Sequence, residues 1–144
     1  MLYTVDQLKQ CFNIEVEYVD LKETGQVDIE HLKALLEESN TKTLVSLMHV
    51  NNEIGNVLDI NAVGNLCKEN KALFHCDMVQ SIGHFNVDLS AVPVDFTAVS
   101  AHKFHGPKGV GFAYIRKNSG LRPLIFGGEQ ERGQRAGTES VHNI

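Results

Sequence analysis

Apolar runs of strand length alternate with helical patterns along this chain, and this alternation constrains the fold more than any other feature. The segments 43–50 (TLVSLMHV) and 72–77 (ALFHCD) are apolar on both faces, which is typical of strands buried inside a parallel sheet. Two more strands are predicted over 94–102 and 109–117, on either side of a turn. The sequence therefore predicts an α/β fold with a mostly parallel sheet flanked by helices.

Helical patterns lie before and between these strands. Asp28 is a predicted N-cap for a helix over 27–39, whose leucines fall on one face. Residues 60–70 form a second helical pattern, and 5–12 a weaker one. The remaining predictions are a strand over 14–21, a small helix over 80–83 and a short strand over 121–128.

Composition narrows the class of protein. A length of 144 residues suggests one domain, and a net charge of −5 without a basic run argues against a nucleic-acid partner. No apolar stretch is long enough to cross a bilayer and no signal-peptide pattern is present, so we expect no membrane contact and a cytoplasmic location. Cys11, Cys67 and Cys76 are odd in number and form no CxxC pair, which favours reduced thiols.

Polar clusters follow three of the predicted strands directly. NNEIG (51–55) follows the strand that ends at Val50, Asp77 follows the next apolar run, and SAHK (100–103) follows the third. Because ligands collect at the carboxyl ends of parallel strands, we expect a binding site at this edge of the sheet.

Asp77 allows more than one interpretation. It could cap the turn that follows, or it could be an anion facing a protonated ring nitrogen. His75 and Asp77 alternate onto one face of the strand and could instead bind a metal, but no third ligand has suitable spacing.

The two lysines of SAHKFHGPKG also differ. Lys103 ends a buried strand, where desolvation would make its amine a better nucleophile towards aldehydes, although an isolated lysine is usually a surface residue. Lys108 lies in a turn, and GPKGVG is too short for a P-loop. The tail 127–140 is rich in glycine and charge, as in a mobile or solvated loop.

Four motifs resemble one family. HVNNEIG (49–55), HCDMVQSIG (75–83), SAHKFHGPKGVG (100–111) and GGEQERGQRAGT (127–138) are similar, in this order, to the signatures of NifS-like cysteine desulfurases. These are pyridoxal-phosphate (PLP) enzymes of the class V aminotransferase group, with a large domain of PLP-dependent fold type I. The resemblance implies desulfuration of L-cysteine to alanine through an enzyme persulfide, whose sulfur passes to an acceptor protein for iron–sulfur cluster assembly or thiolation.

The resemblance also implies roles for individual residues. Lys103 would form the imine with PLP and is the implied catalytic residue, whereas Lys108 would be a loop residue. Asp77 would keep the pyridine nitrogen protonated, and Gln80 would hydrogen-bond the phenolic oxygen of the ring. The other cofactor contacts would come from Ser100 and His102 at the phosphate, Asn52 near the substrate carboxylate, and Thr138 at the phosphate of the partner subunit in a homodimer.

The chain also departs from the family pattern. Residues 1–144 resemble part of the PLP-binding large domain, without the preceding segment that stacks on the ring or the small domain that carries the persulfide cysteine. None of the three cysteines aligns with that residue. The tail has GGEQ where relatives often have three glycines, and His105 takes a place often held by tyrosine. We therefore expect weak PLP binding at best and no turnover from the isolated chain.

Three alternatives stay open at this point. A selenocysteine lyase shares the same PLP framework. The chain could also be a non-catalytic remnant or one component of a split enzyme, although the presence of Asp77, Gln80, Ser100, His102 and Lys103 argues against long drift from PLP use. A metal-binding module using His75, Asp77 and nearby histidines is the most distant alternative; the expected site contains no metal.

Overall fold

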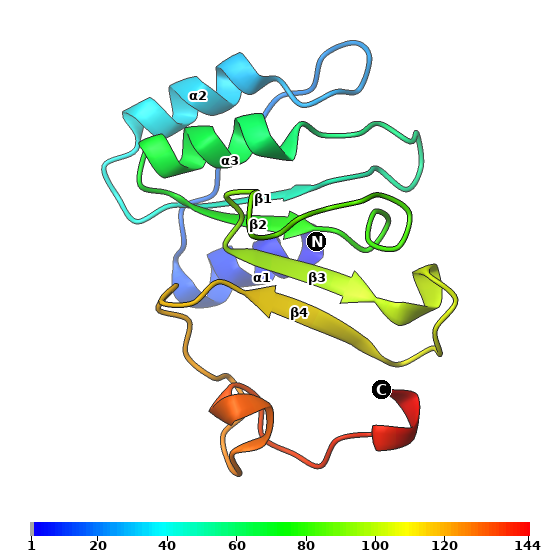
Figure 1. Ribbon diagram of the computed structural model, residues 1–144. Helices are drawn as coiled ribbons and strands as arrows, with labels where there is room; N and C mark the ends of the chain where they lie inside the picture. The colour runs from blue at the N-terminus through cyan, green and yellow to red at the C-terminus, as the bar shows by residue number, and fades with distance from the viewer. Residues whose placement is uncertain (1) are drawn as a thin grey trace. The chain divides into compact units, whose positions relative to one another are not determined.

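The structure, a computed structural model, describes residues 2–144 (Figure 1). The chain divides into two compact units, Met1–Thr41 and Lys42–Ile144. None of the helices among the described residues is sufficiently long and apolar to span a membrane.

The first unit contains two helices, α1 (Leu2–Phe12) and α2 (Ile29–Glu38). The predicted N-cap of α2 is confirmed, because Oδ1 of Asp28 accepts hydrogen bonds from the backbone N–H groups of Glu30 and His31 at 3.0 and 3.2 Å. Leu32 and Leu36 are the buried residues of this helix.

The strand predicted over 14–21 is wrong. This segment forms no ladder, and its last residue, Leu21, makes only an isolated bridge to Val27. Ile14 and Tyr18 are exposed. Apolar and polar residues alternate along this segment as in a strand, but among the described residues no neighbouring strand pairs with it to form a sheet.

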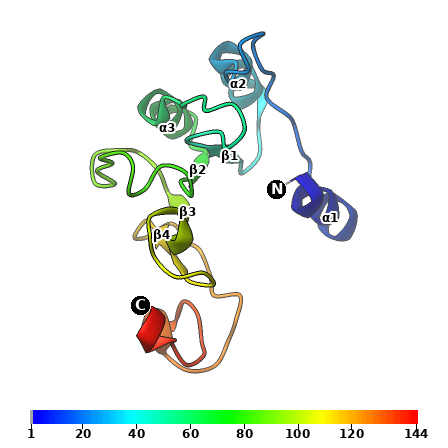
Figure 2. The ribbon, with the colours of Figure 1, turned by 90° about the vertical axis from the view of Figure 1, so that its right-hand side faces the viewer.

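The second unit is built on a four-stranded sheet. Its strands are β1 (Leu44–Met48), β2 (Leu73–Asp77), β3 (Phe96–Ser100) and β4 (Gly111–Ile115), and they lie side by side in that order. The pairs β1–β2 and β2–β3 are parallel, whereas β4 runs antiparallel to β3. Figure 1 shows β3 and β4 pointing in opposite directions, and Figure 2 shows the four strands following one another from another side. The predicted mostly parallel α/β sheet is confirmed.

One face of the sheet packs against helix α3 (Ile60–Glu69), which contacts β2. Asp59 caps this helix by accepting hydrogen bonds from two backbone N–H groups of its first turn. Strand residues alternate between buried and half-buried, so one face carries the core. The most buried core residues of the second unit include Val63, Cys67, Phe74, Cys76 and Thr97.

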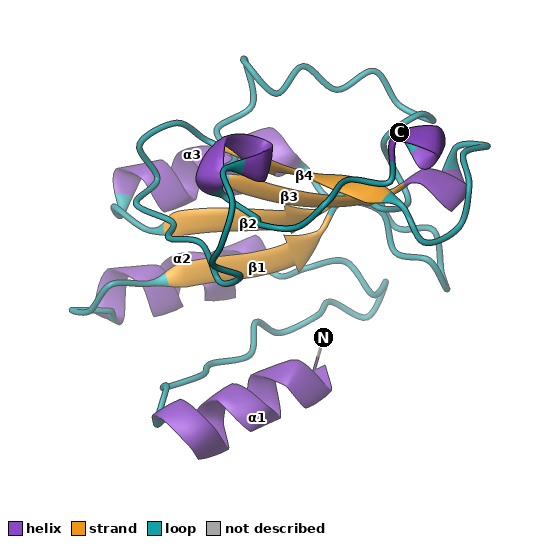
Figure 3. Ribbon diagram, turned by 90° about the horizontal axis from the view of Figure 1, so that it is seen from below, coloured by secondary structure: helices purple, strands orange, loops and turns teal. Residues whose placement is uncertain are grey.

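Two further predictions of regular structure are wrong. The segment 78–85 forms consecutive turns and no small helix, with backbone bonds from Ser81 to Met78 and from His84 to Ser81, each 3.0 Å long. The apolar run 121–128 forms no strand, because no neighbouring strand covers it and Leu124 is 91% exposed. Figure 3 shows that the chain after β4 is mostly loop, interrupted by short 3-10 turns.

Candidate functional site

The carboxyl ends of the three parallel strands meet at one edge of the sheet. Met48 of β1 lies opposite Asp77 of β2, and Asp77 lies opposite Ala98 of β3. The loop 49–58, the turns 78–85 and the segment 101–110 all leave the sheet there. The structure therefore brings together the three polar clusters that the sequence predicted would share an edge.

Asp77 is half-buried at the last position of β2. Its side chain lies on the sheet face opposite to that of Phe74 and Cys76, which are fully buried. Oδ1 accepts a hydrogen bond of 3.0 Å from the backbone N–H of Val79. This bond caps the following turn, as one of the two interpretations expected. A carboxylate has two oxygens with several acceptor positions, so it can also serve a ligand.

Lys103 lies three residues beyond the end of β3, in the 3-10 turn η1 (Ala101–Lys103). The turn is held by Ala101, whose N–H donates to the carbonyl of Val110 at 3.0 Å and whose carbonyl accepts from Phe104 and Gly106. Ser100 shares the sheet face of Asp77, because it follows Ala98 by two positions in an alternating strand. Lys103 is half-buried and His102 is exposed.

Asn52 lies in the loop after β1. Its neighbour Asn51 organises the loop, because Oδ1 of Asn51 accepts from the N–H groups of Glu53 and Ile54 at 2.9 and 3.1 Å. Nδ2 of Asn52 donates to Oε1 of Glu53 at 2.7 Å, and Asn52 is exposed. The loop therefore presents Asn52 at the same edge of the sheet as Asp77.

The other two expected cofactor residues lie in less regular segments. Gln80 is half-buried within the turns that follow Asp77. Thr138 is exposed in the tail, beside Gly137, whose N–H donates to Oε1 of Gln130 at 3.2 Å. The structure brings Gln80 to the edge through the turn that begins at Asp77, whereas Thr138 makes no hydrogen bond to residues of that edge within 2–144.

Two residues near Lys103 were not singled out from the sequence. Nε2 of His84 lies 2.9 Å from the backbone carbonyl oxygen of Lys103. Gly83 has a φ of +85°, and a Cβ atom there would lie 2.4 Å from Cβ of Phe104. No local pattern could reveal these contacts, because they join segments about twenty residues apart in the sequence.

Two histidines near this edge are shielded from solvent, His49 being buried and His75 half-buried. Burial lowers the pKa of His49, whose Nδ1 has no hydrogen-bond partner among the described residues and whose ring lies 5.8 Å from that of Phe85. Burial also lowers the pKa of His75, against the opposing charge of Asp77. Nδ1 of His75 lies 2.8 Å from the hydroxyl of Ser46 on the neighbouring strand. Both rings are therefore favoured in the neutral form.

The structure offers no support for a metal centre. Among residues 2–144, no group of three or more His, Cys, Asp or Glu side chains could hold a metal ion. Two hollows in the second unit also lie apart from the proposed cofactor residues. One, of about 400 Å³, is lined by His49, Phe85 and the start of α3, and the other, of about 300 Å³, by residues 115–121 and Gln134.

The comparisons with known proteins agree with this fold. The sequence matches the aminotransferase class-V family over residues 1–143, and the chain belongs to that family. Cysteine desulfurase IscS from Ruthia magnifica subsp. Calyptogena magnifica is 48% identical over 134 residues, which are 92% of this chain and 33% of the relative. The same-named protein from Histophilus somni (strain 2336) is 46% identical over 132 residues, which are 90% of this chain and 32% of that relative.

Solved structures give the same result. A NifS-like protein has a TM-score of 0.91 and 44% identity, covering 99% of this chain and 39% of its own. SspA in complex with cysteine has a TM-score of 0.91 and 35% identity, covering 99% of this chain and 41% of its own. The resemblance to NifS-like cysteine desulfurases is confirmed. The chain spans about a third of the length of the curated relatives it matches.

Proposed function

We propose that these residues form part of the PLP-binding large domain of a cysteine desulfurase, which converts L-cysteine to alanine and passes the sulfur on as a persulfide. The observation that carries this proposal is the meeting of Asp77, Ser100 and Lys103 at the carboxyl edge of one sheet. Membership of the class-V aminotransferase family supports it, as do relatives named cysteine desulfurase IscS.

The donor set fits the chemical groups of PLP. A half-buried carboxylate suits a protonated pyridine nitrogen, a lysine amine suits an aldehyde, and hydroxyl and imidazole donors suit a phosphate. When bound, PLP acts as an electron sink for a carbanion at the substrate carbon. Asp77 would keep the ring nitrogen protonated, and Lys103 would hold the cofactor through its ε-amine.

The other cofactor contacts belong to the same proposal. Gln80 would face the phenolic oxygen, Ser100 and His102 the phosphate, and Asn52 the substrate carboxylate. Thr138 would reach the phosphate of a partner subunit, which would make the enzyme a homodimer with sites built across the interface. One similar structure, SspA, was solved with cysteine bound, which supports L-cysteine as the substrate here. A cytosolic location and a sulfur-acceptor protein complete the proposal.

The sulfur-accepting thiol is neither Cys67 nor Cys76. Both side chains are buried, at 1% and 0% exposure, and burial raises the pKa of each thiol to about 12. A thiol attacks as its thiolate, so neither residue can take sulfur from a substrate bound at the edge.

Borohydride trapping tests the central assignment. The chain is titrated with PLP, reduced, digested and mapped by mass spectrometry. We expect the pyridoxyl adduct to favour Lys103 over Lys108, and the variant Lys103→Ala to lose it while Lys108→Ala keeps it. An equal or greater yield at Lys108 would contradict the proposal. Alanine release from L-cysteine compared with L-selenocysteine, measured in the enzyme that contains these residues, separates a desulfurase from a selenocysteine lyase.

A further inference from the structure

His84 makes a hydrogen bond whose direction follows from chemistry alone. Its Nε2 lies 2.9 Å from the backbone carbonyl oxygen of Lys103. A carbonyl oxygen can only accept, so Nε2 must carry the proton and donate it. Both the neutral ring protonated at Nε2 and the fully protonated ring meet this requirement.

This hydrogen bond joins the two segments that carry Asp77 and Lys103. The segment 77–84 begins at Asp77, and the segment 98–103 ends at Lys103. At one end of these segments, Met78 N–H donates to the carbonyl of Ala98 at 3.1 Å. At the other end, His84 donates to Lys103. The two residues proposed to hold opposite sides of the cofactor thus lie in segments that are joined at both ends.

A close backbone approach reinforces the contact between the two segments near His84 and Lys103. Gly83 lies against Phe104, the residue after Lys103, where a Cβ atom would come within 2.4 Å of Cβ of Phe104. Inside the turn η1, the carbonyl of Ala101 accepts the N–H groups of Phe104 and Gly106. The Lys103 carbonyl takes no part in those bonds, so His84 is the group that fixes its direction.

We propose that His84 is a positioning residue, which fixes the main chain of Lys103 relative to Asp77 and thereby directs the lysine amine towards the cofactor aldehyde. This inference rests on the proposed function. The lysine side chain is long and flexible. The direction in which it leaves the main chain therefore determines which positions its ε-amine occupies most often. His84 contacts neither the reacting atoms nor the cofactor in this proposal.

Amide hydrogen exchange tests whether the His84 hydrogen bond holds the main chain around Lys103, and it needs no cofactor. The variant His84→Leu removes the donor, whereas His84→Gln keeps an N–H donor at a comparable reach. We expect exchange at Phe104 and Gly106 to accelerate roughly three- to tenfold in His84→Leu, as for the loss of one hydrogen bond, and to return close to wild type in His84→Gln. His142→Leu, which removes an exposed histidine elsewhere, is the matched control and should leave both amides unchanged.

Borohydride trapping then tests positioning. We expect the ratio of pyridoxyl adduct on Lys103 to that on Lys108 to fall roughly three- to tenfold in His84→Leu and to recover in His84→Gln. Unchanged exchange in His84→Leu overturns the inference, and so does faster exchange with an unchanged adduct ratio, since His84 would then be structural only. A wild-type chain that shows no preference for Lys103 overturns the proposed function instead, whatever the exchange data show.

Discussion

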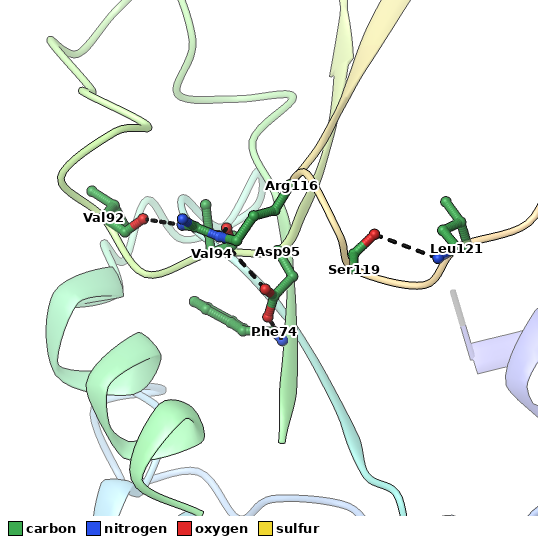
Figure 4. A network of polar contacts seen from close by, with 7 residues as sticks. All are labelled: Phe74, Val92, Val94, Asp95, Arg116, Ser119 and Leu121. Carbon is green, nitrogen blue, oxygen red and sulfur yellow. Dashed lines mark hydrogen bonds and ion pairs between the residues drawn. The ribbon is translucent and has the colours of Figure 1, made fainter. Parts of the chain in front are cut away.

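The guanidinium of Arg116 lies 3.5 Å from the carboxylate of Asp95, measured from Nε to Oδ1, at the edge of the sheet opposite to Lys103. The same guanidinium donates to the backbone carbonyls of Val92 and Val94, each at 2.8 Å, and Oδ2 of Asp95 accepts from the N–H of Phe74 at 2.8 Å (Figure 4). The pair therefore joins the end of β4 to the start of β2 through the residue before β3.

Replacing this arginine should destabilise the sheet. In Arg116→Ala, two carbonyls and one carboxylate lose their charged donor, so we expect the free energy of unfolding to fall by about 1–3 kcal/mol. Urea unfolding followed by circular dichroism measures it. Arg122→Ala, at an exposed arginine in the tail, is the control and should change stability by less than about 0.5 kcal/mol. Equal stability of the two variants would contradict the importance of the network.

Adding a methyl group at Gly83 should separate steric conflict from backbone strain. Gly83 and Gly109 have φ values of +85° and +81°, but only Gly83 has a neighbour, Phe104, within 4 Å of the added Cβ. Gly109→Ala should therefore cost about 1–2 kcal/mol from the left-handed backbone alone. Gly83→Ala carries the same strain and an additional clash of about 1–3 kcal/mol.

Urea unfolding of the two glycine variants measures this difference directly. A larger loss of stability in Gly83→Ala than in Gly109→Ala is the expected result. Similar losses would mean that the segment after Asp77 can move away from Phe104 at little cost.

The elements that the sequence predicted well are those set by local patterns. Asp28 caps α2 as expected, and the apolar runs 43–50 and 72–77 contain β1 and β2. The position of Asp77 at the sheet edge also follows from the sequence, because Asp77 is the last residue of the apolar run 72–77 and therefore lies at the carboxyl end of a predicted strand. Local order along the chain carries this information, so no tertiary contact is needed to predict it.

What the sequence could not predict depends on partners far along the chain. The segment 14–21 alternates like a strand, but a strand needs a neighbour that local pattern does not specify. The contact between His84 and Lys103 joins two loops whose meeting depends on the sheet register. The roles of Gln80 and Thr138 came from resemblance alone and stay predictions.

Thiol labelling should distinguish the three cysteines. Cys11 is exposed, whereas Cys67 and Cys76 are buried with thiol pKa values of about 12. At neutral pH we expect iodoacetamide to modify Cys11 rapidly and the other two only after unfolding in urea. Mass mapping of each cysteine over time measures this, with Cys11→Ser as the control that removes the fast phase. Rapid labelling of Cys76 in the native chain would contradict the burial of β2.

His49 and His75 should make the free energy of unfolding depend on pH in one direction. Burial lowers the pKa of His49 and of His75 in the folded chain below the ordinary value of 6.5. Below that pH the unfolded chain takes up protons that the folded chain does not, so the free energy of unfolding falls as the pH falls from about 6.5 towards the lowered pKa. Above about pH 6.5 both rings are neutral in the folded and in the unfolded chain, so the free energy of unfolding no longer depends on their protonation.

Urea midpoints between about pH 5.5 and 7.5 measure this slope, since histidine is the side chain whose ordinary pKa lies in that window. We expect His49→Gln and His75→Gln each to flatten it, whatever their effect on stability at neutral pH, because each removes one group that takes a proton only on unfolding. His142→Gln, at an exposed histidine, should leave the slope unchanged. A slope in His49→Gln equal to that of the wild type would mean that its ring accepts a proton without loss of the fold.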